Sequence, residues 1–372
     1  MVCPALMVQN HFLYDFAGMK PVYDYYPNDS KMNLYWILIF IIFISFYLGS
    51  YAGNRLNHKR LFVRNDLFFE EIKITEITWC ILIPMILVDQ YIIFSNRQFL
   101  FTGYANFLDM DEYFQGQVAS FNCLFAFMYI CLLQNNKAPR LHKKILLFLF
   151  AENTIVLLST GSRQYFMVPF VGILIWALDK KLIPIKKLLI GGLIMALFFI
   201  VIGIWRSMDD TDISSDIFIF AFFGESLYTW LSAASFVSDN NSINLVEAPF
   251  NFIGWFINFI PSLFIDKSEL VQDVPYNFSN PWGAINMIVS SYGNFGLLLT
   301  PVFIFMGGFF MSYLRNKKTD IWKATYYCSC GVIPFMIFRD MSSATKIVFM
   351  CFIIYPAFLI KIKTTKKAPR HI

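Results

Sequence analysis

Three arginines follow long apolar segments, where a positive charge is costly unless something holds it. Arg163 ends the run Ser159-Thr160-Gly161-Ser162-Arg163, Arg206 follows Ile204-Trp205, and Arg339 follows Ile337-Phe338. A guanidinium is always charged and presents a planar fork of donors that fits carboxylate or phosphate. Several guanidinium groups that converge would hold a diphosphate without a metal. Pairing with nearby acids is the alternative for each arginine: Asp209, Asp210, Asp212 and Asp340.

Acidic residues near or inside apolar segments are candidates for a general base. Glu225 lies in Phe223-Gly224-Glu225-Ser226, and Asp340 follows Arg339 directly. A carboxylate within reach of a hydroxyl could take its proton during a transfer reaction. A structural hydrogen bond explains Glu225 as well. Glu152 lies in the middle of an apolar segment, about three helical turns before Arg163, and fits a structural role better than a catalytic one.

Metal and nucleotide chemistry have little support in the sequence. Of the four histidines only His11 falls on the side predicted to carry the arginines, and no H-E-x-x-H or other ligand spacing occurs. Phosphate-binding glycine loops of ATPases and dinucleotide enzymes do not occur either. The run Asp209-Asp210-x-Asp212 is interpreted as a solvated acidic loop. We therefore predict no metal, no cofactor and no nucleic-acid partner.

Long helices must position these residues. Hydrophobic residues make up 57% of the 372 and charged residues 15%, with a mean hydropathy of +0.55. Soluble domains average about 25% charged residues. The composition predicts an all-α polytopic membrane bundle, with residues 1–372 forming a single transmembrane domain in the lipid bilayer. Eleven spans are expected, at 33–52, 75–94, 117–134, 145–160, 164–178, 187–205, 216–237, 248–265, 293–314, 322–338 and 345–361. Residues 1–9 resemble part of a further span, so we expect a truncated first span that would bring the number to twelve.

Basic residues alternate between loops and so predict the orientation. Lys and Arg concentrate in the segments 54–73, 135–144, 180–187, 315–318 and 361–370. The positive-inside rule places these segments in the cytoplasm and the three arginines on the outer side. The large outer loop, residues 266–292, mixes aromatic and amide side chains that suit sugar binding, and equally an interfacial aromatic belt. Candidate substrate-binding residues on this side are Ser162, Tyr276, Tyr292 and Lys346.

Three short motifs resemble the Wzy-type oligosaccharide repeat-unit polymerases of bacterial surface polysaccharide synthesis. They are Thr160-Gly161-Ser162-Arg163, Ser290-Ser291-Tyr292-Gly293-Asn294-Phe295-Gly296 and Phe338-Arg339-Asp340. An acid often expected before the second motif is replaced here by Ser290 and Ser291. The span number and the late outer loop agree with this resemblance.

The resemblance implies a metal-independent glycosyltransferase with a glycosyltransferase-C-like fold in the bacterial inner membrane. It would work on the periplasmic face and transfer a growing glycan from undecaprenyl diphosphate to a new lipid-linked repeat unit. A chain-length regulator and a flippase of the same pathway are the implied partners. Arg163, Arg206 and Arg339 would stabilise the diphosphate, and Glu225 or Asp340 would serve as the base.

Three other functions remain open. A flippase for lipid-linked oligosaccharide would share the basic site, but would usually show internal repeats and charges at mid-membrane depth. An O-antigen ligase would be expected to carry an outward histidine. A structural partner of a glycan assembly machine would leave the outward arginines unexplained.

Overall fold

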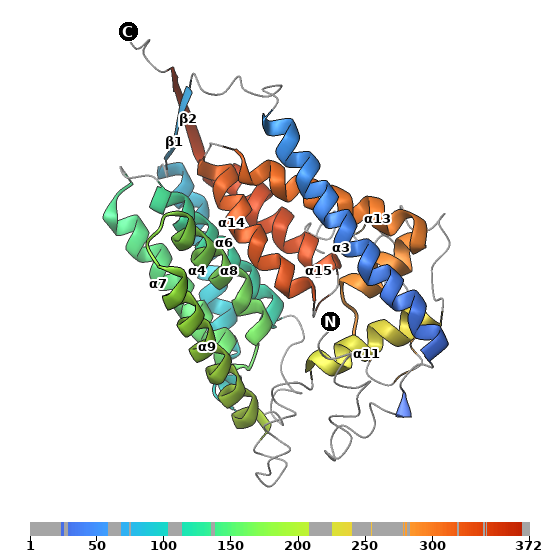
Figure 1. The fold of residues 1–372 in the computed structure, drawn as a ribbon. Coiled ribbons are helices and arrows are strands. Elements are labelled where there is room, and N and C mark those ends of the chain that lie inside the picture. Colours follow the sequence, from blue (N-terminus) through green and yellow to red (C-terminus); the bar gives the residue numbers. More distant parts are fainter. Residues whose placement is uncertain are drawn as a thin grey trace.

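The computed structural model describes residues 24–25, 29–58, 68–73, 76–102, 114–134, 138–207, 225–239, 254, 278, 280, 283–317, 320–337, 339 and 341–366. Helices dominate these residues (Figure 1). They are α3 (Asp29–His58), α4 (Glu76–Ser95), η2 (Arg97–Phe99), α6 (Phe114–Gln134), α7 (Arg140–Ser159), α8 (Arg163–Asp179), α9 (Ile185–Ser207), α11 (Glu225–Ser238), α13 (Met287–Arg315) and α14 (Asp320–Met336), followed by a last helix made of α15 (Met341–Lys346), the π-helical η4 (Ile347–Ile354) and α16 (Tyr355–Leu359).

Helices occupy the predicted spans outside 216–265. In the described part of the chain, six helices are long and apolar enough to cross a membrane: Met32–Leu56, Thr78–Ser95, Phe114–Gln134, Ile185–Ile202, Met287–Arg315 and Met341–Leu359. A further apolar helix, Gln164–Asp179, is shorter. The number of eleven spans therefore stays a prediction, as does the truncated span at residues 1–9, which lie outside the described ranges. Only the second part of predicted span 216–237 is described, as α11, and it runs across one end of the bundle (Figure 1).

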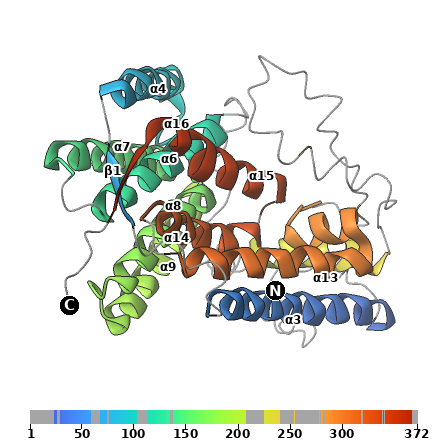
Figure 2. The ribbon, with the colours of Figure 1, turned by 90° about the horizontal axis from the view of Figure 1, so that it is seen from above.

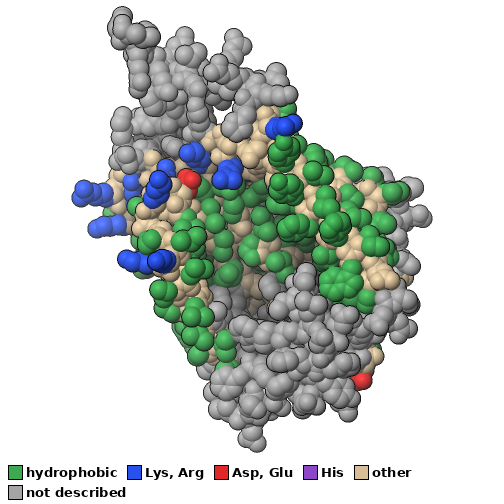
Figure 3. All heavy atoms as spheres, in the orientation of Figure 1, with side chains coloured by type: hydrophobic (Ala, Val, Ile, Leu, Met, Phe, Trp, Pro, Cys, Tyr) green, Lys and Arg blue, Asp and Glu red, His purple; other side chains and the backbone are tan. Residues whose placement is uncertain are grey.

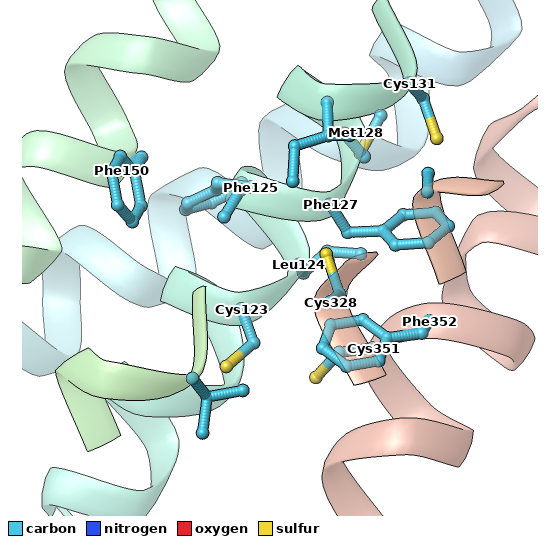
Figure 4. Close-up of a cluster of buried hydrophobic side chains, with 14 of the residues drawn as sticks. Cys123, Leu124, Phe125, Phe127, Met128, Cys131, Phe150, Cys328, Cys351 and Phe352 are labelled. Carbon is cyan, nitrogen blue, oxygen red and sulfur yellow. The ribbon is translucent and has the colours of Figure 1, made fainter. Parts of the chain in front are cut away.

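Two hydrophobic clusters organise the helices. The larger one joins α4, α6, α7, α8, α14 and the last helix, and its centre holds Phe125, Phe127 and Phe352 (Figure 4). The smaller cluster joins α3, α11 and α13 around Trp230. In the second view α3 and α13 lie side by side, apart from α4, α6 and α7 (Figure 2). Four cysteines serve as apolar packing residues in the larger cluster: Cys123, Cys131, Cys328 and Cys351.

Glycines allow two helix pairs to pack with their backbones in close approach. A Cβ atom added at Gly308 of α13 would collide with the backbone of Phe46 in α3, and one added at Gly49 would collide with Phe305. On the other side of the molecule, a Cβ at Gly331 of α14 would collide with the carbonyl of Val168 in α8. Small residues have this use in membrane bundles, where helices associate by close van der Waals packing.

The surface has the pattern expected of a protein in a bilayer. Large apolar side chains are exposed along α3, α4 and α9. Lys and Arg side chains gather near one end of the face seen in Figure 3. The exposed Lys180, Lys181, Lys186 and Lys187 follow α8, and the exposed Arg140 begins α7. This basic end is where the cytoplasmic side was predicted.

A two-stranded antiparallel ribbon departs from the all-helical expectation. Strand β1 (Phe68–Lys73) pairs with β2 (Lys361–Lys366), with Phe68 opposite Lys366 and Lys73 opposite Lys361. The ribbon joins the segment before α4 to the segment after the last helix. Both segments belong to the loops predicted to be cytoplasmic, so the ribbon ties two basic loops together at one end.

Candidate functional site

The turn between α7 and α8 carries the first motif and has a defined helix-ending geometry. Gly161 has φ 73°, and its N–H donates to the carbonyl of Leu158 at 3.0 Å. The N–H of Ser162 donates to the carbonyl of Leu157 at 2.8 Å. This pair of bonds is the Schellman motif, in which a glycine in the left-handed region ends a helix. Gly161 therefore has a structural role: it ends α7 and lets the chain turn directly into α8.

Helix α8 starts immediately after this turn. Ser162 is buried and is the N-cap residue, and Arg163 is the first residue of the helix. The carbonyl of Thr160 accepts a hydrogen bond at 3.3 Å from Gln115 Nε2, so the start of α6 also holds the turn. The Thr160 hydroxyl donates back to the carbonyl of Leu157 at 3.0 Å. The backbone before Arg163 is thus held by hydrogen bonds to both α6 and α7.

Arg339 brings the third motif to the first. Its Nε donates to Gln164 Oε1 at 2.6 Å, and its guanidinium carbon lies 5.6 Å from the ring centre of Tyr165. Tyr165 also packs against Phe335 of α14, with ring centres 5.4 Å apart. Because Gln164 follows Arg163 directly, two motifs that are about 175 residues apart in the chain meet at the first turn of α8.

The second motif joins the same region through a backbone bond. The N–H of Met341, the first residue of α15, donates to the hydroxyl oxygen of Ser290 in α13 at 3.2 Å. Ser290 stands where the family resemblance suggested an acid. Its hydroxyl here satisfies one of the N–H groups that a helix leaves open at its N-terminus. Ser290 thus anchors the start of the last helix to α13.

Helix α13 breaks a few residues beyond this anchor. Gly296 has φ 59° and ψ −168°, a conformation that only glycine adopts readily. Thr300 bridges the break, because its hydroxyl donates to the carbonyls of Gly296 at 2.6 Å and of Ser291 at 3.1 Å. Ser290, Ser291 and Thr300 are all buried. Non-helical backbone within a membrane protein is tolerated where its freed polar groups find other partners, and the Thr300 hydroxyl is such a partner here.

Buried amides fix α11 against the start of α13. Asn286 is the N-cap of α13 and accepts from the N–H groups of Ile288 and Val289 at 2.9 and 3.1 Å. Its amide donates to the carbonyl of Thr229 in α11 at 3.2 Å. Asn280 adds a second link by donating to Ser235 Oγ of α11 at 2.5 Å. These bonds position the helix that begins at Glu225.

The predicted site residues divide into four groups. Arg339 lies at the converged motifs, with Ser162 in the adjoining turn, and Lys346 is a half-buried residue two helical turns further along the last helix. Tyr292 packs inside the smaller cluster, with its ring edge-on to Phe236. The backbones of Arg163, Arg206 and Glu225 are placed at the start of α8, in the last turn of α9 and at the start of α11. Asp340, Tyr276 and the acidic run 209–212 lie outside the described residues, as does most of the loop 266–292.

Sequence reasoning missed the residues that join the motifs. Gln164 and Tyr165 had a usable signal, because they follow Arg163 on the same helical turn. Gln115, Asn280 and Asn286 gave none, since their partners are 45 or more residues away in the chain. In the described part of the chain, no three His, Cys, Asp or Glu side chains are grouped so that they could hold a metal ion. The expectation of metal-independent chemistry remains a prediction.

The fold and the site define a class: a helical integral membrane protein in which three short polar motifs meet at the end of the bundle opposite the basic loops. The family model for the O-antigen polysaccharide polymerase Wzy matches residues 6–368, and the chain belongs to this family. No curated protein and no solved structure matches the chain. Members of the family polymerise O-antigen repeat units and act on lipid-linked oligosaccharide in a membrane.

Proposed function

We propose that this chain joins lipid-linked oligosaccharide repeat units on the periplasmic face of the bacterial inner membrane. The growing glycan leaves undecaprenyl diphosphate and is transferred to the non-reducing end of the next lipid-linked repeat unit. The observation that carries the proposal is the docking of Arg339 on the first turn of α8, beside Arg163. Arg339 thereby lies at the helix start whose first residue is Arg163, at the end of the molecule opposite the basic loops.

The chemistry needs fixed positive charge. The bond between the anomeric carbon and the diphosphate oxygen breaks, and negative charge develops on a leaving group that stays attached to its lipid. Pre-positioned donors that face such developing charge usually supply the largest catalytic contribution. Arg163, Arg206 and Arg339 are the proposed donors. The acceptor hydroxyl oxygen forms the new bond, and its proton passes to Glu225 or Asp340 as general base.

Sugar and lipid recognition would come from neighbouring side chains. Ser162 lies in the turn that presents Arg163, and Lys346 lies on the helix that follows Arg339. Tyr276 is the proposed substrate-binding residue of the outer loop. Tyr292 is 4% exposed, so it would reach substrate through its hydroxyl rather than by stacking its ring on a sugar. Since the diphosphate bond supplies the energy, the reaction requires no nucleotide. A chain-length regulator and a flippase are the proposed partners.

The test is replacement of Arg163 or Arg339 by Ala or Lys in the native host, followed by analysis of the surface polysaccharide ladder. We expect single repeat units in place of long chains, with a loss of roughly 10²–10³-fold in kcat for the alanine variants on purified lipid-linked repeat units. Lysine should rescue poorly, because it lacks the planar fork. Arg97 provides the matched control. It is an exposed arginine at the same end of the bundle, and its guanidinium carbon lies 4.0 Å from the ring centre of Phe94.

The outcomes separate the competing functions. Normal ladders from variants at Arg163, Arg206 and Arg339 together, with membrane levels like those of the Arg97→Ala control, would exclude the proposed site. Loss of all surface sugar, single units included, would point to a flippase.

A further inference from the structure

A layer of fully buried polar side chains crosses the apolar interior between α4, α6 and α7, which are neighbours in Figure 2. Its members are Asp89 of α4, Asn122 of α6 and Asn153 of α7, each with 0% of its surface exposed. The proposed transfer chemistry uses none of them. A carboxyl group in such a place is expensive, and it normally has a specific partner.

Helical spacing shows that the three residues lie at one level. One turn towards the converged motifs, all three helices contribute to a small apolar cluster, through Ile92 and Ile93, Val118 and Ala119, and Val156 and Leu157. One turn in the other direction they contribute to the larger cluster, through Met85 and Ile86, Phe125 and Ala126, and Leu149 and Phe150. Apolar side chains therefore enclose the polar layer on both sides along the helix axes.

Three consecutive residues of α7 each bond to a neighbouring helix at this level. Glu152 Oε2 accepts from Gln90 Nε2 at 2.9 Å, and Asn153 Nδ2 donates to Asp89 Oδ2 at 3.1 Å. Thr154 Oγ1 accepts from Asn122 Nδ2 at 3.4 Å. Helix α7 is thus linked twice to α4 and once to α6, two turns before it ends in the Gly161 turn.

The layer has more acceptors than donors. Asp89 Oδ1, Asn122 Oδ1 and Asn153 Oδ1 are buried and have no hydrogen-bond partner among the residues that the structure describes. Helix α6 contains no charged residue, and α16, which also packs on α4, contributes only Tyr355 as a titratable group. The η2 segment carries Arg97, which lies about two turns beyond Asp89 with its guanidinium over the ring of Phe94. Glu152 is the charged group that faces Asp89 from α7, and it has the same sign. An ionised Asp89 would therefore lie in an apolar layer without a compensating charge.

We propose that Asp89 is a proton-binding site: it is a neutral carboxylic acid in the folded protein, and its Oδ1–H donates to the amide oxygen of Asn122 or Asn153. The single proton changes one acceptor into a donor and so satisfies two of the three remaining oxygens. Through Asn153, Asp89 is a positioning residue for α7 and the turn that presents Arg163. The protonation state itself does not depend on the proposed function.

The isosteric variant Asp89→Asn tests the proton directly. Infrared difference spectra of the purified full-length protein at neutral pH should show the C=O stretch of a protonated carboxylic acid in the native protein and its loss in the variant. Linkage gives a second readout. An unfolded chain ionises Asp89 at neutral pH, whereas the folded chain keeps the proton. Stability should then fall as pH rises above about 4, by about tenfold per pH unit in the unfolding equilibrium constant for one proton, for as long as the folded chain keeps that proton. The Asp89→Asn variant should lack this component.

Two control variants make the result specific. Glu152→Gln should keep the acid band, because Glu152 bonds to Gln90 and does not carry the proposed proton. Asp239→Asn changes an exposed acid at the end of α11 and should leave both readouts unchanged. The proposal is overturned if a folded Asp89→Asn variant shows the same infrared spectrum and the same pH slope as the native protein. It is also overturned if the native protein gains stability from Na⁺ at constant ionic strength and this gain disappears in Asp89→Asn, since a metal cation would then occupy the layer.

Discussion

At the scale of single residues, the Arg339 guanidinium is held by a hydrogen bond to Gln164 and by the ring of Tyr165. An exposed hydrogen bond to a charged group contributes about 0.5–1.5 kcal/mol, because water competes for both partners. Gln164→Met removes the acceptor, and we expect kcat to fall by roughly 2- to 10-fold while the protein remains folded. Gln164→Glu keeps an acceptor of the same shape but neutralises the cation, so Arg339 stays in place and KM for the anionic donor substrate rises. Steady-state kinetics on lipid-linked repeat units measure both parameters.

Gln98 supplies the matched control for this pair, because it is an exposed glutamine at the same end of the bundle. Gln98→Met should leave kcat and KM unchanged. If Gln164→Met behaved like Gln98→Met, the bond to Arg339 would have no part in positioning it.

Arg163 and Arg339 are candidates from the sequence because a cation at the end of an apolar segment is recognisable without a structure. The sequence could not show that Arg339 reaches the helix that begins at Arg163, since the bond between Gln164 and Arg339 spans 175 positions. Tyr292 could be singled out from the sequence, but its role could not. An aromatic residue near an outer loop could stack on a sugar or pack in a core, and the packing of Tyr292 against Phe236 distinguishes these two roles. Gly161 belongs to the first of the three motifs, and its role in ending α7 follows from its positive φ.

At the scale of helices, the adjacent residues Gly307 and Gly308 test the packing of α13 on α3, because only Gly308 faces α3. A Cβ at Gly308 would collide with Phe46 of α3, whereas one at Gly307 meets nothing within 4 Å. Gly308→Ala should therefore destabilise the protein by about 1–3 kcal/mol. Gly307→Ala should be neutral or stabilise it by up to about 1 kcal/mol, because alanine favours a helix over glycine. Thermal unfolding of the two purified variants measures the difference, and equal midpoints would contradict the close packing of α3 on α13.

Helix positions followed from apolar run length, whereas two features of the elements did not. The break at Gly296 depends on a single dihedral pair, and the hydroxyl of Thr300 repairs it locally. The pairing of β1 with β2 joins two charged segments from opposite parts of the chain. Neither segment has the strict alternation of apolar and polar residues that predicts a strand. Such distant pairings depend on how the helices between them are packed.

At the scale of the whole molecule, the segment from Arg339 to Met341 connects the two hydrophobic clusters. Arg339 bonds to α8 of the larger cluster, and Met341 bonds to Ser290 of α13, which belongs to the smaller one. Both links lie at the end of the bundle where the motifs converge. A donor bound there would contact both groups of helices, and the relative position of the groups would then affect catalysis.

The orientation of the molecule in the membrane determines whether this end can meet periplasmic substrate. Lys181 is exposed at the basic end, after α8, and Gln98 is exposed at the opposite end, after α4. We expect Gln98→Cys to react with a membrane-impermeant maleimide in intact spheroplasts, and Lys181→Cys to react only after the membrane is permeabilised. The unsubstituted protein is needed to measure the background, because Cys80 of α4 is exposed, whereas four other cysteines are buried in the larger cluster. The positive-inside rule requires this result, since the lysines beside Lys181 would otherwise have been translocated. The reverse labelling pattern would place Arg163 and Arg339 in the cytoplasm. A site there could not receive repeat units presented on the periplasmic leaflet, so labelling at these two positions tests the proposed function without any measurement of activity.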